Sequence, residues 1–220
     1  MGTNELQPLP RSFYMPDADH VAKKLLGHFL IRNTPEGPAG GAIVEVEAYL
    51  GNDPACHSFR GETKRNKSMF GPPGFSYVYL IYGMHYCFNA VCATPGKAEA
   101  VLIRAIEVQF GEDWMRQQRQ VDTTRQLSNG PARLCQALNI LRKHDGLDIC
   151  DAASPVFIAQ NPNRAAFVRK HGPLVTTTRI GISKAAEHHL RFYLDNSSFV
   201  SKRVSRKAAN EKLLMVRKRK

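Results

Sequence analysis

The chain has 220 residues, of which 43% are hydrophobic and 23% are charged, and its formal net charge is +12. This composition is typical of a soluble globular protein, and the length suits one sizeable core, so we expect a single domain. No apolar run reaches the ~18 residues of a membrane span, and the N-terminus lacks the apolar region of a secretory signal.

Cysteine and histidine usage argues against disulfides and metal centres. The five cysteines are odd in number and form no C-x-x-C pair, which indicates reduced thiols in a cytosolic compartment. The eight histidines are scattered, and the adjacent pair His188 and His189 cannot both face one metal from a regular helix or strand. We therefore expect no metal site.

The first predicted element is a helix over residues 17–26, which Asp17 can cap and Gly27 can end. Strand signals follow on either side of a turn-rich segment, over residues 28–33 and 41–50. A long polar loop then occupies residues 51–74, and a loop of that length in a compact domain is usually functional or disordered.

Residues 75–92 are aromatic and β-branched, and Gly83 in their middle predicts two strands around a tight turn near Tyr82 and Met84. Further strands are predicted over residues 100–108 and near 155–159, 178–183 and 190–195. Helices are predicted over 111–120 and 131–141. The second helix has an apolar stripe made of Leu134, Ala137, Leu138 and Leu141. Strands in series with few helices between them favour an α+β fold, in which helices lie at the periphery of an antiparallel sheet.

Positive charge is concentrated near the end of the chain. Residues 201–220 hold nine Lys or Arg and one acid, Glu211, and a second basic patch occupies residues 60–67. The first cluster is compatible with a solvated chain end or with an arm that binds a polyanion. We divide the chain into one domain, residues 1–200, and a basic tail, residues 201–220.

The segment EVEAYLGNDPACHS, residues 45–58, gathers acids, a phenol and an imidazole. Alternation in the strand that leads into it predicts a core face and an opposite face, made respectively of Val44, Val46, Ala48, Leu50 and of Ile43, Glu45, Glu47, Tyr49. The second face would be solvated, were it not headed by Tyr49 and followed by His57. Alternation alone does not distinguish the roles of the two glutamates.

Arg104 shares a strand face with Leu102 and Ile106. A buried unpaired charge costs several kcal/mol, so this arginine requires a carboxylate partner, and the 43–49 strand offers the best one. A structural ion pair and a role in fixing a reactive carboxylate both fit. In the aromatic run, Tyr82 differs from the other tyrosines because it sits at the turn, where it is exposed unless it inserts into something.

Eight segments occur in an order that resembles the alkyladenine (3-methyladenine or 3-methylpurine) DNA glycosylase family. They are IVEVEAYLG, HSF, SMF, YVYLIYGMHYCFN, AVLIRAIE, NGPARLCQALNI, RIGI and RFY. The resemblance extends from about residue 12 to about residue 201. It implies a curved, open-barrel-like antiparallel sheet in one compact domain, with a protruding β-hairpin.

The resemblance also implies a monofunctional enzyme that flips alkylated or deaminated purines out of duplex DNA and hydrolyses the N-glycosidic bond. Glu47 would activate the attacking water, and Arg104 with the main-chain carbonyl of Ile180 would hold that water. The base would stack between Tyr49 on one side and His57 with Tyr79 on the other. The remaining implied contacts are Asn89 at the pocket border, Tyr82 as the wedge, and Met84, Met69 and Arg133 on the DNA side.

The expected partner is double-stranded DNA containing damaged purines, with no membrane and no cofactor. We expect a monomer that acts on the chromosome, in the cytoplasm or, if the source is eukaryotic, in the nucleus. Two other classes remain open: a non-catalytic nucleic-acid-binding module, which the basic tail favours, and an RNA or nucleoside N-glycosidase that uses the same pocket. Formation of abasic sites in hypoxanthine-containing DNA separates the glycosylase from the binding module, and activity on a free nucleoside would support the other enzyme class.

Overall fold

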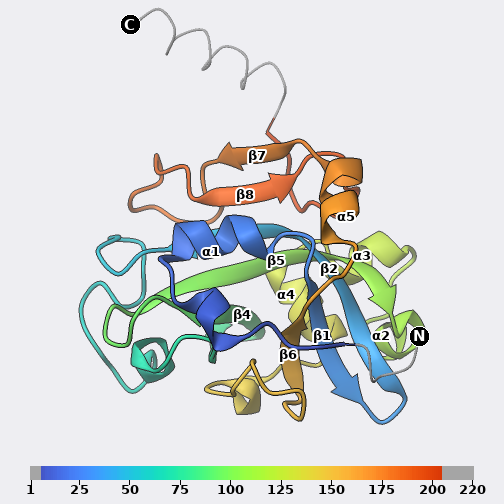
Figure 1. Cartoon of the computed structure of the whole chain (residues 1–220), viewed down its shortest axis with the longest axis horizontal. Coiled ribbons are helices and arrows are strands. Elements are labelled where there is room, and N and C mark those ends of the chain that lie inside the picture. The colour runs from blue at the N-terminus through green and yellow to red at the C-terminus, as the bar shows by residue number, and fades with distance from the viewer. Residues whose placement is uncertain (1–5, 205–220) are drawn as a thin grey trace, which may run out of the picture.

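The computed structural model describes residues 6–204, which form one antiparallel sheet with helices around it (Figure 1). The strands are β1 (Phe29–Thr34), β2 (Gly37–Tyr49), β3 (Ser76–Ile81), β4 (His85–Cys92), β5 (Glu99–Phe110), β6 (Val156–Ala159), β7 (Leu174–Thr177) and β8 (Arg191–Leu194). The α-helices are α1 (Ala18–Leu25), α2 (Glu112–Gln118), α3 (Thr124–Ser128), α4 (Pro131–Ala137) and α5 (Arg164–His171), and 3-10 helices occur at Arg11–Tyr14, Lys67–Phe70 and Arg142–His144. None of the helices in residues 6–204 has the length and apolar character that crossing a bilayer requires.

Strand β2 is the centre of the sheet. The strands run in the order β3-β4-β5-β2-β1-β6, and every pairing is antiparallel. The second half of β2, at Glu45–Glu47, also pairs with β8, which in turn pairs with β7. The predicted α+β class, with one antiparallel sheet in a single domain, is confirmed.

Glycines and bulges curl the sheet at β2. A Cβ atom on Gly41 would lie 1.9 Å from the carbonyl oxygen of Glu107 in β5, and one on Gly40 would lie 2.0 Å from that of Leu30 in β1. Only glycine permits such close approach of neighbouring backbones. The pairing of β2 with β5 shifts register at Gly40 and on both sides of Glu45, and such bulges bend and twist a strand.

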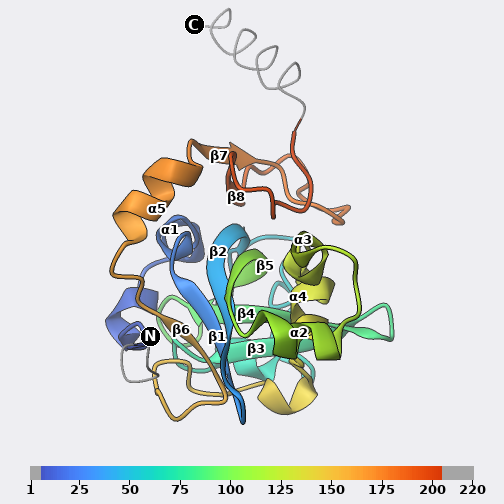
Figure 2. The same ribbon diagram turned by 90° about the vertical axis from the view of Figure 1, so that its right-hand side faces the viewer.

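Helices cover the sheet from two sides. Figure 2 shows α1 on one side of β2 and α2, α3 and α4 on the other. Val21, Ala22 and Leu25 of α1 are buried, as are Leu134 and Leu138 around α4. Each large aliphatic side chain removed from water in this way contributes about 1.5–3 kcal/mol to folding.

The first helix begins as predicted, but a different residue caps it. Asp17 occupies the N-cap position without a side-chain hydrogen bond to the helix. The Glu99 carboxylate of β5 accepts from the Ala18 N–H at 2.8 Å instead. A carboxylate acceptor is favourable at the helix N-terminus because the first N–H groups of a helix have no partner within the helix. The helix is thereby tied to the sheet.

Helix α4 is shorter than the predicted 131–141. It ends at Ala137, and Asn139 adopts a positive φ of 47° that turns the chain away. Leu141, the predicted last member of the apolar stripe, is consequently 38% exposed. The prediction extended the helix too far because apolar spacing continues past the turn.

The strand predicted over 178–183 is wrong. Strand β7 lies just before it, at Leu174–Thr177, and residues 178–183 form an irregular segment whose Ile180 N–H donates to Glu47. The helices α3 and α5 were not predicted, because α3 has five residues and α5 has a charged, weakly patterned sequence. The other predicted strands are present.

Both faces of β2 are buried, from Ala39 to Ala48. The face that carries Glu45 and Glu47 is therefore covered, and each of the two glutamates is 0% exposed. Strand β8 pairs with this part of β2 and β7 pairs with β8 (Figure 1), while the segment after β7 reaches Glu47 through the Ile180 N–H. Groups from the segment after β7 and from the chain after β8 thus enclose the two glutamates.

Candidate active site

A cavity of about 320 Å³ lies where β2, β3, β4 and β5 meet the irregular segment after β7. Its wall contains nine of the eleven predicted site residues, namely Glu47, Tyr49, His57, Met69, Tyr79, Tyr82, Asn89, Arg104 and Ile180. Met84 and Arg133 lie outside this wall. Residues from distant segments of the sequence therefore converge on one cavity.

Glu47 is held in the cavity wall by three donors. Its Oε1 accepts from the Ile180 N–H at 2.8 Å and lies 3.2 Å from Nη1 of Arg104. Its Oε2 accepts from the Tyr49 hydroxyl at 3.0 Å. The side chain is fully buried, so the carboxylate has a fixed orientation toward the cavity.

Arg104 has the carboxylate partner that its sequence environment required, and it has two. Its Nε donates to Glu45 at 2.9 Å while Nη1 contacts Glu47. Burial disfavours the charged guanidinium, but the Glu47 and Glu45 carboxylates outweigh burial and raise the pKa of Arg104. The arginine thus remains a cation in a wall where it is 6% exposed.

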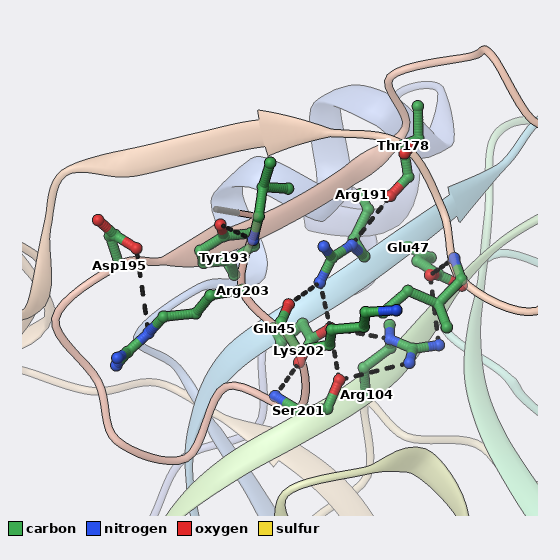
Figure 3. A network of polar contacts seen from close by, with 12 residues as sticks. Glu45, Glu47, Arg104, Thr178, Arg191, Tyr193, Asp195, Ser201, Lys202 and Arg203 are labelled. Carbon is green, nitrogen blue, oxygen red and sulfur yellow. Dashed lines mark hydrogen bonds and ion pairs between the residues drawn. The ribbon is translucent and has the colours of Figure 1, made fainter. Parts of the chain in front are cut away.

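The two glutamates, which alternation could not distinguish, occupy different surroundings. Glu47 lines the cavity, whereas Glu45 lies behind it among Arg104, Arg191 and Ser201 (Figure 3). Bulges on both sides of Glu45 separate the two side chains. Glu47 is therefore the carboxylate that a bound molecule can reach.

His57 and Tyr79 form an aromatic corner of the cavity. Their ring centroids are 4.6 Å apart at 76°, and Nδ1 of His57 lies 2.9 Å from the Tyr77 hydroxyl. Burial, followed by the nearby Arg65, lowers the pKa of His57, so the ring is neutral at pH 7. Asn89 is fixed at the border by a 2.9 Å bond from Nδ2 to the Tyr77 carbonyl.

Arg179 lies against Tyr49, a residue of the cavity wall, and sequence reasoning missed it. Its guanidinium lies 4.7 Å from the Tyr49 ring centroid, donates to the Ala48 carbonyl at 3.0 Å and forms a buried ion pair with Asp53. This cation supports the Tyr49 ring and fixes the chain next to Ile180. Its position directly before Ile180 in RIGI was the available signal.

The β3–β4 hairpin presents an exposed tip, as predicted. Tyr82 is 79% exposed and Met84 is 71% exposed, and the positive φ values of Tyr82 and Gly83 form the tight turn. Met69, expected on the DNA side, is 2% exposed in the cavity wall instead. Arg133 is exposed on α4, where its Nη1 donates to Asn129.

The arrangement suits the binding of a flat ring system beside an oriented carboxylate. The aromatic rings of the wall can stack on a planar ring system, and an oriented carboxylate can accept a proton or stabilise positive charge. Among residues 6–204, no three His, Cys, Asp or Glu side chains gather as metal ligands would.

Comparison with known proteins gives the same family throughout. The family model described as "Methylpurine-DNA glycosylase (MPG)" matches residues 12–198. Proteins named "Putative 3-methyladenine DNA glycosylase" from Methanoculleus marisnigri and Carboxydothermus hydrogenoformans are 48% and 46% identical to the chain. Each alignment covers 89% of this chain and 99% of the relative. A protein of the same name from Rhodopseudomonas palustris is 48% identical over 88% of the chain and 90% of its own length.

Proposed function

The chain belongs to the methylpurine-DNA glycosylase family and is a DNA N-glycosylase, and we propose that it releases alkylated and deaminated purines from duplex DNA by water that Glu47 activates. The lesions in question are 3-methyladenine, 7-methylguanine, hypoxanthine and etheno-adenine. The observation that carries the proposal is the buried, triply held Glu47 carboxylate in the wall of an aromatic cavity.

Glu47 has the capacity to bind a water molecule as well as its protein donors. A carboxylate has about four acceptor positions, and Ile180, Arg104 and Tyr49 take three of them. The free position on Oε2 would accept a proton from water, while Arg104 and the Ile180 carbonyl orient its oxygen. Water oxygen then bonds to C1′ of the sugar as the C1′–N bond breaks, and Glu47 takes the water proton. The base leaves with the bonding electrons: a cationic methylated purine becomes neutral, and a neutral base such as hypoxanthine takes up a proton as it leaves.

One carboxylate is sufficient for cationic lesions. O-Glycosidases use two because the leaving oxygen must be protonated. A methylated purine already carries positive charge, so the remaining task is to stabilise the oxocarbenium-like sugar and deliver water. No lysine takes part in this scheme, so the product is an abasic site and the strand is not cut.

The cavity walls would read the extruded base. Tyr49, supported by Arg179, would stack on one side, and His57 with Tyr79 on the other. His57 would also hydrogen-bond the purine edge, and Asn89 would disfavour guanine. Tyr82, which projects from the hairpin tip, would fill the space that the base leaves in the duplex.

Double-stranded DNA is the proposed partner of a monomeric enzyme that works in the cytoplasm on the chromosome. The formal net charge of +12 favours contact with phosphates, and the exposed Arg133 would contribute one such contact. Met84 on the hairpin tip would contact the duplex beside Tyr82, whereas the buried Met69 would act through the cavity wall.

The Glu47→Gln variant tests the proposal. We expect abasic-site formation on hypoxanthine-containing duplex to fall by ~10²–10⁴-fold, because the amide cannot take the proton. Lesion binding and the thermal unfolding midpoint should stay close to wild type. Glu36→Gln, which changes an exposed glutamate, is the matched control and should retain full activity.

Near-normal base release by Glu47→Gln would remove this residue from the water-activating role. Release from a free nucleoside at a rate similar to that from the duplex would instead favour a nucleoside N-glycosidase. If the wild-type chain binds damaged DNA without releasing any base, the catalytic proposal fails as a whole.

A further inference from the structure

Glu45 is the centre of a second buried network directly behind the cavity (Figure 3). Its Oε1 accepts from Nε of Arg104 at 2.9 Å, from Nη1 of Arg191 at 2.8 Å and from the Ser201 hydroxyl at 2.9 Å. Its Oε2 accepts from the Ser201 N–H at 2.7 Å. The carboxylate is 0% exposed, and Ser201 supplies two of these four donors.

Arg104 connects this network to the cavity. Its Nε binds Glu45, its Nη1 contacts Glu47 at 3.2 Å, and its Nη2 lies 3.4 Å from the Ser201 hydroxyl. A guanidinium is planar, so contacts on three of its nitrogens fix its position and its rotation. The orientation of Arg104 toward Glu47 therefore depends on Glu45 and Ser201.

Arg191 makes a second connection. Its Nη1 bridges Glu45 and the Lys202 carbonyl, the latter at 2.8 Å, and its Nε donates to the Thr178 carbonyl at 3.0 Å. Thr178 lies two residues before Ile180, whose N–H holds Glu47. The chain after β8 is thus joined through Arg191 to the segment that covers the cavity.

Charge balance explains why the arrangement is stable in the interior. Two carboxylates, Glu45 and Glu47, face two guanidiniums, Arg104 and Arg191, and each guanidinium contacts Glu45. A buried ion pair is favourable only when its geometry and remaining hydrogen bonds are satisfied. The hydroxyl of Ser201 can donate to Glu45 while accepting from Arg104, which suits this position.

We infer that Ser201 and Glu45 are positioning residues for base excision: the chain returning after β8 clamps Glu45, Glu45 orients Arg104, and Arg104 orients Glu47. The inference rests on the proposed role of Glu47. It assigns the residues at the start of the basic tail to the active centre, although Ser201 does not line the cavity.

Ser201→Ala in the full-length chain tests the inference. It removes the hydroxyl contacts to Glu45 and Arg104 and keeps the backbone N–H. Single-turnover release of hypoxanthine is measured with protein in excess, which separates the maximal rate from the half-saturating protein concentration. We expect the maximal rate to fall about tenfold, as for loss of a hydrogen bond to a charged group, with half-saturation changed less than about twofold.

Two matched variants accompany it. Ser201→Thr retains the hydroxyl, and its maximal rate should lie within about twofold of wild type. Ser198→Ala removes an exposed serine of the same segment and should leave both parameters unchanged. Rates are compared at a temperature at which circular dichroism shows every variant folded.

An equal maximal rate in wild type and Ser201→Ala would overturn the inference, as would a loss that Ser201→Thr shares. If Ser201→Ala is less stable but its rate per folded molecule is unchanged, the contact merely anchors the chain end, and the inference is wrong. Failure of the proposed function is separate, because then the wild-type chain releases no base.

Discussion

Glu47 receives donors of three different kinds, and each contributes something different to the carboxylate that we propose as the water activator. Arg104 supplies a positive charge, the Ile180 N–H belongs to the backbone and cannot rotate away, and the Tyr49 hydroxyl is neutral. Burial and then the Glu47 charge raise the pKa of Tyr49, so the phenol remains protonated and continues to donate. Such preorganised donors need no rearrangement during the reaction.

The lowered pKa values of two histidines outside the cavity, His28 and His144, lead us to expect that acid destabilises the fold. Burial, followed by Arg164 for His28 and by Arg32 and Lys143 for His144, lowers the pKa of each to about 4. Both Nδ1 atoms accept backbone N–H bonds, from Asn161 and Leu141 respectively. Unfolded histidine titrates near 6.5, so between about pH 4 and 6.5 the unfolded chain binds more protons, and stability falls as pH falls through that window.

We expect each histidine to lower the free energy of unfolding by about 1–2 kcal/mol between pH 7 and pH 5, measured by urea titration. His144→Gln should reduce this pH dependence, because glutamine has no charged form. His20→Gln, at an exposed position, is the control and should leave the slope unchanged. A slope that is the same in wild type and His144→Gln would show that His144 does not cause the loss.

Some residues of the site could be predicted from the sequence because a physical requirement selects them. Arg104 lies among apolar residues of a strand, so it needed a carboxylate from a neighbouring strand, and it has one. Arg179 and Arg191 carry no such signal, because one lies in an irregular segment and the other in a four-residue strand. Their partners, Asp53 and Glu45, become apparent only once the chain has folded.

The β3–β4 hairpin uses a tyrosine where the backbone favours another residue. Tyr82 has a φ of 52°, in the left-handed region that asparagine and glycine adopt more readily than tyrosine. Its side chain is 79% exposed. Backbone strain at an exposed aromatic without a core contact is a reason to seek a function for it. The proposed insertion of Tyr82 into the duplex during base extrusion would be such a function.

Tyr82→Asn should therefore separate folding from base extrusion. Asparagine tolerates the left-handed turn, so we expect the unfolding midpoint to be unchanged or higher. Excision of a correctly paired lesion should fall, and excision of a mispaired lesion should fall less, because its unstacking costs less. Tyr82→Phe keeps the ring and is the control. Equal losses on both substrates would contradict the wedge.

Prediction at the level of elements succeeded where apolar periodicity and turn residues agree. Gly83 marked the hairpin, and alternation marked β2 and β5. It failed at 178–183, since the alternating Ile180 and Ile182 indicate a strand, whereas the segment is irregular and its Ile180 N–H donates to Glu47. The backbone of this segment binds a side chain of the site and not a neighbouring strand, and no sequence pattern indicates such a contact.

The cavity is a property of the whole molecule. It requires the sheet to curl at Gly40, Gly41 and the bulges around Glu45, so that strands and cover segments enclose one space. Sequence patterns give the strands but not the angle between them. Alternation alone therefore predicted only which strand face each residue lies on. The resemblance to a known family was needed to predict which residues share one pocket.

The basic tail must be divided at a different residue from the one that composition suggests. Residues 201–204 contact the domain: Ser201 binds Glu45, Arg203 donates to the Ser197 carbonyl, and the Val204 N–H donates to the Tyr193 hydroxyl. Residues 205–220, which hold seven Lys or Arg and one Glu, lie outside the residues that the structure describes. A deletion that tests the tail as a phosphate-binding arm should therefore begin at 205.

Deletion of 205–220 should leave single-turnover base excision nearly unchanged on saturating DNA, because every proposed catalytic and positioning residue remains. Affinity should change, since each cation that contacts a phosphate adds ~0.9 to the slope of log affinity against log salt. Engagement of part of the tail at a time predicts a slope lower by roughly 2–3 after deletion. Affinity for lesion and for undamaged duplex should weaken equally, because phosphate contacts position a protein without specifying sequence.

Both affinities are measured at several salt concentrations, with and without the tail. Coincident slopes would show that the tail is only a solvated chain end, and a selective loss of lesion binding would contradict a purely electrostatic arm.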